Sequence, residues 1–319
     1  MISKKISIEK KSEGGREFLA VKAPFPYSLE DTLECGQCFR HELVKKEGGY
    51  VEYMIPVGNF LARIGQKSLG EVMLFDTDEE TAKSILIPYL SLDTDYGMIK
   101  DDIISHTDSE WLKRAADAAE GIAILRQDPW QTIFSFIISQ NNNIPRIRKI
   151  VREICAEYGV NISLQNGAKE CPTGAINTTP CEEICKRCGK CYTFPTPQQI
   201  LEDPEKMLPS HPGFRYKYLY DAALKVCEGD VNLDDITNAR SYAFTVAELK
   251  KIKGVGDKVA ACAALFGFGN LEAFPIDVWM KRAIDTYFNG KLDVEALGPY
   301  AGIAQQYIFH YIRNIERNG

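Results

Sequence analysis

The sequence predicts an α+β protein in which a strand-rich region comes first and helices follow. Short runs rich in β-branched and aromatic residues occupy residues 1 to about 75, and such runs are typical of strands. Apolar residues at helical spacing begin near Thr81 and dominate from Ser109. A Gly-Val-Gly hinge at 254–256 separates two apolar segments, which is the pattern of a helix-hairpin-helix. Strands at the front and helices behind define the α+β class.

The N-terminal part contains four runs that predict strands. Gly48-Gly49 marks a tight turn directly before one of them, because glycine accepts the backbone angles that such turns require. The runs are Phe18–Val21, Tyr50–Ile55, Phe60–Ile64 and Leu69–Phe75.

The first strong helix signal lies at Asp128-Pro129. Aspartate is a favoured N-cap and proline a favoured first helical residue, and an apolar run to Ile138 follows them. The same apolar spacing predicts seven further helices over Arg146–Tyr158, Gln198–Glu202, Tyr216–Cys227, Tyr242–Lys251, Lys258–Phe266, Asp277–Phe288 and Leu297–Ile315.

Composition places the 319-residue chain among ordinary globular proteins, with 45% hydrophobic and 26% charged residues. No apolar run approaches the roughly 20 residues that cross a bilayer, so no membrane partner is expected. The N-terminal segment is charged and has no signal-peptide core. We therefore expect a cytoplasmic protein, associated with the nucleoid if the source is prokaryotic, with mostly reduced cysteines.

Net charge argues against a nucleic-acid partner at first sight, because it is −6 with a pI near 5.5. Local clusters of cations matter more than the total, however. Basic residues surround the hinge and follow two other turns, at Lys250, Lys251, Lys253, Lys258, Arg146, Arg148, Lys149, Arg215 and Lys217. This pattern predicts a basic cleft on an acidic protein.

Lys258 and Asp277 are the residues that indicate chemistry. Lys258 comes two residues after the hinge and so falls in the first turn of the second hairpin helix. The positive end of the helix dipole disfavours an ammonium ion there and favours a free amine. The hinge amides of Gly254 and Gly256 are free of bulky side chains and suit a phosphate. An amine beside a carboxylate and a nucleic-acid backbone suggests attack on a sugar carbon.

Four motifs resemble the 8-oxoguanine DNA glycosylase/lyase family of the helix-hairpin-helix (HhH-GPD) superfamily. They are Gly254-Val-Gly-x-Lys258 with Pro275-x-Asp277, Arg126-Gln-Asp-Pro129, Phe134–Asn143 and Cys35-Gly-Gln-Cys-Phe-Arg40. The resemblance extends from about Tyr27 to about Arg313. It implies an antiparallel sheet in a TBP-like domain at 1–118. It also implies a glycosylase domain at 119–319 whose two helical subdomains flank a cleft.

The resemblance implies a bifunctional enzyme that needs no cofactor for catalysis. A damaged base must leave the duplex before it can be reached. The Lys258 amine then attacks C1′ and forms a Schiff base that permits strand cleavage. Asp277 stabilises the charge that develops on the sugar and also caps the next helix. The expected partner is double-stranded DNA with 8-oxoguanine opposite cytosine, bound by a monomer.

The base pocket implied by the resemblance contains Gly36, Cys262, Gln305 and Phe309. Cys262 is four residues after Lys258, and Phe309 is four after Gln305, so each pair shares a helix face. The flipped purine would lie between Phe309 and Cys262, with Gln305 at its Watson–Crick edge. A carbonyl at Gly36 would accept from the N7 hydrogen of the lesion. The ordinary alternatives are a core aromatic for Phe309 and a turn glycine for Gly36.

The resemblance also assigns DNA contacts. Asn141 and Asn142 would fill the gap left by the extruded base, although asparagine also favours simple turns. Arg146 and Arg215 would recognise the opposite cytosine, and Phe214 would be the wedge. The family commonly has tyrosine at the wedge position. In a second departure, Trp279 stands where animal members carry histidine.

A cysteine-rich insertion at about 164–194 has no counterpart in the family pattern. Cys181, Cys185, Cys188 and Cys191 have the density of a metal site in a reduced compartment, with Cys171 as a possible fifth candidate. Four thiolates suit either structural Zn²⁺ or a [4Fe–4S] cluster. The alternative is a loop of free thiols.

Two other functions fit parts of the pattern. A helix-hairpin-helix glycosylase for another damaged base would share the hairpin and the lysine, but the four pocket residues argue against it. A non-catalytic DNA-binding scaffold would need only the hairpin, and the presence of Lys258 with Asp277 argues against that.

Overall fold

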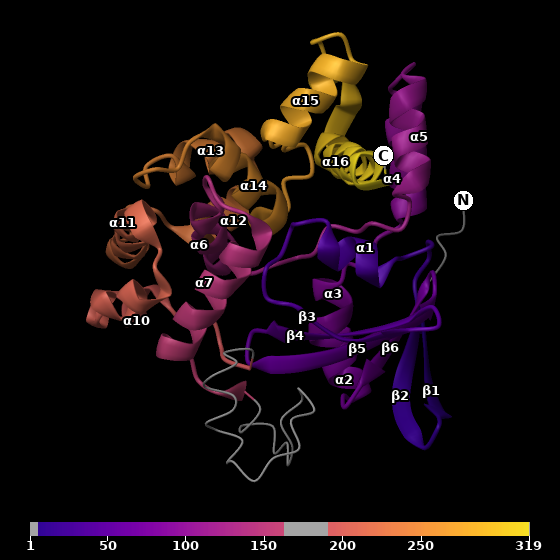
Figure 1. The fold of residues 1–319 in the computed structure, drawn as a ribbon, viewed down its shortest axis with the longest axis horizontal. Coiled ribbons are helices and arrows are strands. Elements are labelled where there is room, and N and C mark those ends of the chain that lie inside the picture. The colour runs from indigo at the N-terminus through magenta and orange to yellow at the C-terminus, as the bar shows by residue number, and fades with distance from the viewer. Residues whose placement is uncertain (1–5, 163–190, 319) are drawn as a thin grey trace.

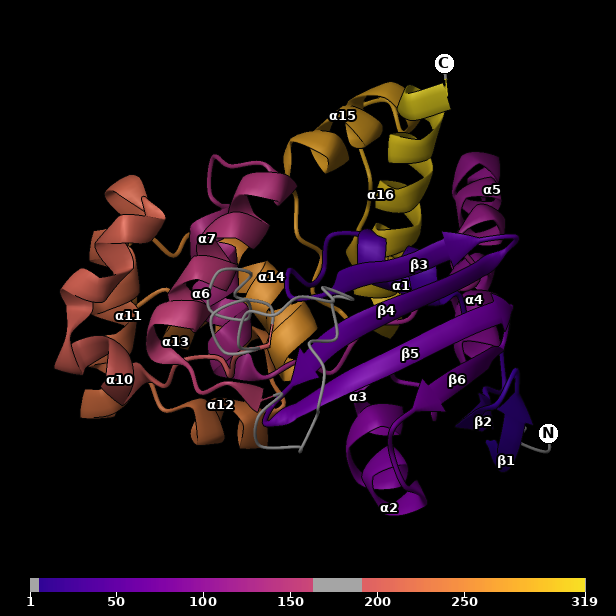
Figure 2. The same cartoon turned by 60° about the horizontal axis from the view of Figure 1, so that its bottom comes forward.

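A computed structural model describes residues 6–162 and 191–318, with the side chains of 316–318 excepted. Its N-terminal part is one six-stranded antiparallel sheet (Figures 1 and 2). The strands are β1 Ser7–Glu13, β2 Arg16–Lys22, β3 Glu42–Glu47, β4 Tyr50–Val57, β5 Phe60–Ser68 and β6 Glu71–Phe75. The spatial order is β1-β2-β6-β5-β4-β3. The four expected strands are confirmed, and β1 and β3 are additional.

Both additional strands lie at the edges of the sheet. β1 (SIEKKSE) and β3 (ELVKKE) are mostly charged, so neither shows the apolar alternation that predicts a strand. Charge on an edge strand protects it from pairing with another chain. One segment of the expected strand region is instead a helix, α1 at Leu29–Glu34. Ser28 caps this helix, because its side chain accepts from the Asp31 amide. A serine followed by acidic residues is the local sequence signal that predicts such a helix start.

The remaining described residues are largely helical, as the sequence predicts. The α-helices are α2 Glu79–Thr81, α3 Ile87–Tyr89, α4 Tyr96–Ser105, α5 Glu110–Ala118, α6 Pro129–Ser139, α7 Ile144–Tyr158, α10 Pro197–Glu202, α11 Tyr216–Glu228, α12 Leu233–Ala239, α13 Tyr242–Leu249, α14 Asp257–Phe268, α15 Val278–Tyr287 and α16 Ala301–Asn318. A π-helical turn, Ala82–Leu86, joins α2 to α3, and 3₁₀ turns cover Pro204–Ser210, Gly213–Arg215 and Glu295–Tyr300.

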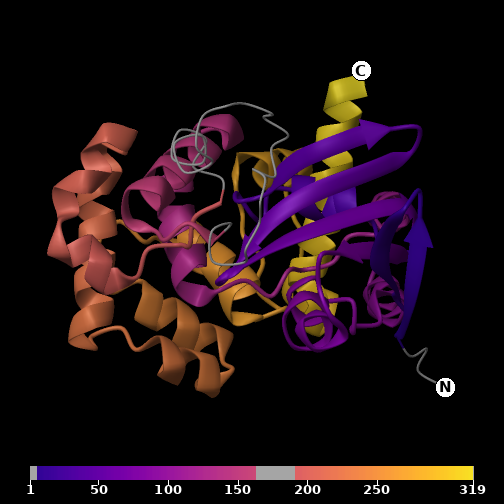
Figure 3. The ribbon, with the colours of Figure 1, turned by 90° about the horizontal axis from the view of Figure 1, so that it is seen from below.

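The helices form two groups (Figure 3). In one group α14 packs against α6, α7 packs against α6, and α10 packs against α11. In the other, the C-terminal helix α16 packs against α5 and α15. A continuous hydrophobic core includes residues on both sides of position 118, such as Leu112 and Ile133. The division into domains at 1–118 and 119–319 therefore stays a prediction.

Within the described part of the chain, no helix is long and apolar enough to cross a membrane.

Candidate active site

The hairpin between α13 and α14 places Lys258 as expected. Gly254 has φ +78°, and a Cβ there would lie 2.4 Å from the Tyr218 ring, so only glycine fits. Gly256 is the N-cap of α14 and has open space around it. Lys258 is the second residue of that helix, as the spacing predicts.

The amine of Lys258 points toward apolar and sulfur-containing neighbours. Its Nζ lies 5.2 Å from the centroid of the Phe136 ring, and its charge acts on the thiol of Cys262. Burial raises the pKa of that thiol, and the charge of Lys258 opposes this only partly. Three other hairpin lysines are ion-paired: Lys250 to Asp257 at 2.6 Å, Lys251 to Glu248 at 2.6 Å and Lys253 to Asp221 at 3.7 Å.

Asp277 stands at the start of α15, as its N-cap. Its Oδ1 accepts from the Met280 amide at 2.8 Å, which is the N-cap geometry that the sequence predicts. The two residues line the same cleft, whose volume is about 1070 Å³. Val278 and Trp279 also line this cleft, and Val278 is 77% exposed.

Behind the cleft lies a smaller pocket that brings together the residues expected to hold the base. Its lining includes the two residues expected to carry out the chemistry, Lys258 and Asp277, and the four expected to hold the base, Gly36, Cys262, Gln305 and Phe309. We call these six residues the base pocket. They come from the turn after α1, from α14, from the start of α15 and from α16. The sequence did not single out Phe136, which also lines the pocket, although it lies inside the Phe134–Asn143 motif.

Gly36 occupies a turn that the buried side chain of the next residue, Gln37, holds in place by hydrogen bonds. Its φ is +89°, a conformation that favours glycine, and a Cβ there would lie 3.7 Å from Ile144 and 3.9 Å from Phe309. The neighbouring Gln37 is fully buried. Its amide nitrogen donates to the carbonyls of Thr32 and Ala123, both at 2.8 Å. These bonds anchor the turn to α1 and to the segment before α6.

Gln305 and Phe309 project from α16 on the same side, as their spacing predicts. Gln305 is 4% exposed, and its Oε1 accepts from Gln306 at 2.6 Å. The amide nitrogen of Gln305 is then the group available to a base. Phe309 is half-buried, and the Arg313 guanidinium lies 5.2 Å from its ring centroid.

Two of the expected DNA contacts, Asn141 and Asn142, line the cleft. We call these two together with Arg146, Phe214 and Arg215 the DNA-facing rim, after the contacts expected of them. Asn141 has φ +47°, and Asn142 donates to the Ile138 carbonyl at 3.1 Å. Arg146 is exposed in the first turn of α7. Phe214 is 51% exposed and makes an edge-on contact with Tyr218.

Arg215 differs from the rest of the rim because its side chain is turned inward. It is 3% exposed and donates to the carbonyls of Gln140, of Asn141 at 2.9 Å and of Pro212 at 3.1 Å. The bonds use four of the five N–H donors of a guanidinium. Arg215 therefore shapes the asparagine loop, and its contact with cytosine stays a prediction.

The expected metal ligands Cys171, Cys181, Cys185 and Cys188 lie outside the described residues. Cys191 is described and fully buried. The Cys191 carbonyl accepts from the Ile162 amide at 2.8 Å, so the described residues on the two sides of the undescribed segment meet. Residues 6–162 and 191–318 contain no group of three or more histidine, cysteine or acidic side chains arranged for a metal ion.

Comparisons with known proteins give a consistent result. Residues 22–133 match the family described as the N-terminal domain of 8-oxoguanine DNA glycosylase. A Clostridium acetobutylicum 8-oxoguanine glycosylase/lyase, solved with DNA containing cytosine opposite 8-oxoguanine, is 30% identical. Its TM-score is 0.78, with 97% of this chain and 98% of that chain covered.

Two further relatives agree. A structure named MBOgg1, solved with a low-affinity DNA ligand, is 30% identical with a TM-score of 0.79, covering 98% of this chain and all of that one. The Saccharomyces cerevisiae N-glycosylase/DNA lyase is 26% identical over 281 residues, which are 80% of this chain and 66% of the yeast protein.

Proposed function

The chain belongs to the 8-oxoguanine DNA glycosylase/lyase family, and on that premise we propose that it excises 8-oxoguanine from duplex DNA and then nicks the strand. The observation that carries the proposal is the base pocket, where an amine, a carboxylate, an amide and an aromatic ring from distant parts of the sequence line one cavity. No cofactor takes part in the proposed chemistry.

Lys258 is the proposed nucleophile. Its nitrogen bonds to C1′ of the extruded nucleotide as the bond from C1′ to the base breaks, and the base leaves with the electron pair and gains a proton. The sugar ring then opens to give a Schiff base. Loss of a C2′ proton breaks the C3′–O bond, which nicks the strand. The aromatic ring of Phe136 and the thiol of Cys262 give the amine a weakly polar setting.

Asp277 is the proposed partner of this amine. The Met280 amide fixes one carboxylate oxygen at 2.8 Å, so the group is held in place before substrate arrives. A carboxylate beside C1′ stabilises the positive charge that develops on the sugar when the base departs. The cap and the catalytic role use the same side chain without conflict, because a carboxylate accepts several hydrogen bonds.

The proposed specificity for 8-oxoguanine rests on Gly36, on Gln305 and on the two residues at the faces of the base, Phe309 and Cys262. The Gly36 carbonyl would accept from the hydrogen that 8-oxoguanine carries at N7 and would repel the lone pair of guanine there. An unpaired buried acceptor costs about 1–3 kcal/mol, which sets the discrimination that this one contact supplies. Phe309 and Cys262 would hold the faces of the purine, and the Gln305 amide its Watson–Crick edge.

The proposed partner is double-stranded DNA with 8-oxoguanine opposite cytosine. Asn141 and Asn142 would fill the gap in the duplex, Arg146 and Arg215 would contact the cytosine, and the amides at Gly254 and Gly256 would hold a phosphate. We propose that one copy of the chain suffices and that it acts in the cytoplasm, on the nucleoid in a prokaryote. The Zn²⁺ or [4Fe–4S] site of the insertion remains a proposal, which elemental analysis and a visible spectrum would test.

Borohydride trapping tests the function directly. The protein is incubated with a duplex containing 8-oxoguanine opposite cytosine, and borohydride reduces any Schiff base to a stable adduct. We expect an adduct with the native protein and none with Lys258→Gln. Lys113→Gln on α5, which removes an equal charge away from the site, should retain it. Native protein that gives no adduct would indicate a scaffold, and adducts only with other lesions would indicate a different glycosylase.

A further inference from the structure

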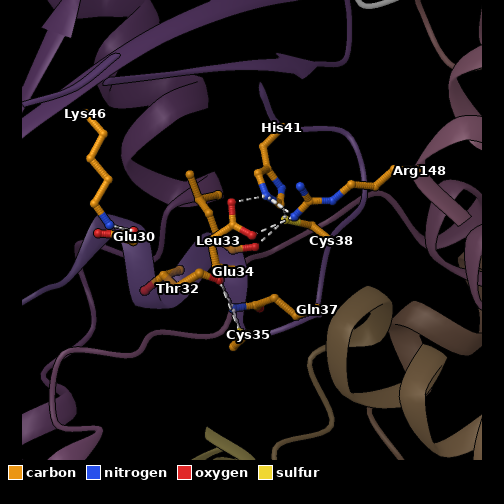
Figure 4. A network of polar contacts seen from close by, with 10 residues as sticks. All are labelled: Glu30, Thr32, Leu33, Glu34, Cys35, Gln37, Cys38, His41, Lys46 and Arg148. Carbon is orange, nitrogen blue, oxygen red and sulfur yellow. Dashed lines mark hydrogen bonds and ion pairs between the residues drawn. The ribbon is translucent and has the colours of Figure 1, made fainter. Parts of the chain in front are cut away.

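A polar network links the end of α1 to α7 (Figure 4). Glu34, the last residue of α1, accepts from Arg148 of α7, with 2.8 Å between Oε2 and Nη2. The same Nη2 of Arg148 lies 2.5 Å from Nε2 of His41. Oε1 of Glu34 lies 3.1 Å from this His41 nitrogen. On its other side, Nδ1 of His41 lies 3.3 Å from the sulfur of Cys38. Four side chains thus converge where the two segments meet.

The network is buried at His41, whereas the side chains of Glu34 and Arg148 are 40% and 30% exposed. The His41 side chain is fully buried, and burial lowers its pKa. Both ring nitrogens of His41 have partners, with Glu34 and Arg148 at Nε2 and Cys38 at Nδ1. Burial alone would raise the pKa of Glu34, but the bond to His41 and the charge of Arg148 outweigh it and bring that pKa to about 2. Glu34 is therefore ionised throughout the physiological range.

The position of the network in the chain gives it a consequence for the site. Glu34 precedes Gly36 by two residues, and Arg148 lies in the helix whose N-cap, Asn143, ends the asparagine loop. Both residues line the cleft. Ile144, also in the first turn of α7, lies 3.7 Å from the position of a Cβ on Gly36. The network therefore holds the wall that meets the base next to the loop that faces the duplex.

Geometry in the DNA makes this spacing matter. The extruded nucleotide stays covalently attached to the strand, so its base reaches the pocket at a fixed distance from the gap that it leaves. Gln37 anchors the Gly36 turn to α1 and to Ala123, away from α7. The Glu34–Arg148 pair is the ionic link in the opposite direction, between residues 114 positions apart in the sequence.

We propose that the Glu34–Arg148 ion pair, supported by His41, is a positioning element that sets the Gly36 turn against the asparagine loop for recognition of the extruded base. The inference rests on the proposed function. It implies that the pair matters when a base must be recognised. Nicking of an abasic site that already exists should depend on it little, because no base then enters the pocket.

The test compares two reactions in the same variants. Arg148→Met and Glu34→Gln are assayed by single-turnover excision of 8-oxoguanine and, separately, by nicking of a preformed abasic site. We expect excision to slow about tenfold and nicking to change less than twofold. The double variant should be no slower than either single variant, because both remove one interaction.

Glu110 provides the matched control. It is paired to Lys113 within α5 at 2.9 Å, and neither residue lines the cleft. Glu110→Gln removes the same charge from an ion pair elsewhere on the protein and should leave both reactions unchanged. Arg148→Lys, which keeps the charge, should recover part of the excision rate.

Three outcomes would overturn the proposal: equal losses in excision and nicking, no loss in either, or additive losses in the double variant. Thermal melting of each variant identifies general unfolding, and if Arg148→Met unfolds, Arg148→Lys and Glu34→Gln still decide. Native protein that excises nothing would instead contradict the proposed function.

Discussion

The base pocket and the DNA-facing rim are built on opposite principles. In the pocket, Cys262 and Gln305 are each 4% exposed and Asp277 is already fixed by a backbone amide. On the rim, Phe214 is 51% exposed, and Arg146 extends into solvent. The hairpin lysines beside the rim are paired with acids of the same chain. Asp277 is held in place before DNA arrives, whereas these lysines must exchange partners to contact a phosphate.

This difference separates chemistry from binding. Changes in the pocket should lower the rate of base excision with little effect on the affinity for DNA. Changes on the rim should lower the affinity for DNA. A pocket variant that mainly weakens binding, or a rim variant that mainly slows chemistry, would break the distinction.

The largest effect is expected for Asp277→Asn. Asparagine is as good an N-cap as aspartate, so α15 should keep its start and the variant its thermal stability. The carboxylate charge is lost, and excision should slow on the order of a hundredfold or more. Single-turnover excision with a melting curve measures both. Asp128→Asn makes the same change at the N-cap of α6 and should leave excision near the native rate. If both variants lose excision equally, Asp277 acts only as a helix cap and has no catalytic role.

A smaller effect is expected for Phe214→Ala on the rim. The exposed ring has little packing to lose, so the melting temperature should hardly change. Stacking of a base on an aromatic ring contributes about 1–3 kcal/mol, and affinity for the lesion duplex should fall about tenfold at constant salt. Titration with a Lys258→Gln background avoids turnover during the measurement. Phe214→Tyr should bind as the native protein does, and unchanged binding by Phe214→Ala would remove the wedge role.

The contrast also explains which features the sequence could predict. Lys258 with Cys262, and Gln305 with Phe309, are each four residues apart on a helix, so one period places both members of a pair on one face. Asp277 could be placed as an N-cap by its own neighbours. The family resemblance identified these residues together with Gly36, and the local rules explain why each pair shares a face.

Other features depend on contacts that no local pattern encodes. The charged strands β1 and β3 form because neighbouring strands offer hydrogen bonds, and their own residues give no apolar alternation. Arg215 turns inward because the carbonyls of Gln140 and Asn141 lie about 75 residues away in sequence but adjacent in space. The basic cleft expected from Lys250 and Lys251 is partly neutralised by acids that the fold brings beside them.

The smallest expected effect concerns pH and His41, behind the wall of the pocket. Burial holds the pKa of His41 below its ordinary value near 6.5. The groups that face the ring are Glu34, Arg148, Cys38 and Tyr53. Because the ring is neutral in the fold, the unfolded chain binds one more proton as pH falls below 6.5. The contribution of neutral His41 to the free energy of unfolding is complete above pH 6.5, and it is lost as pH falls toward the pKa of His41 in the folded protein.

Glu34 adds to the same trend at lower pH. Its pKa is about 2 in the fold against an ordinary 4.5, so its contribution is present above 4.5 and is lost between 4.5 and 2. Of these two residues, only His41 contributes to the pH dependence between pH 7 and pH 6. The uptake of one proton by the unfolded chain changes the free energy of unfolding by less than about 1 kcal/mol over that step. Urea unfolding at both pH values should therefore show a smaller pH dependence for His41→Gln than for the native protein. His106→Gln, at an exposed position, should keep the native dependence; if His41→Gln keeps it too, then His41 is not the group that makes stability depend on pH in this range.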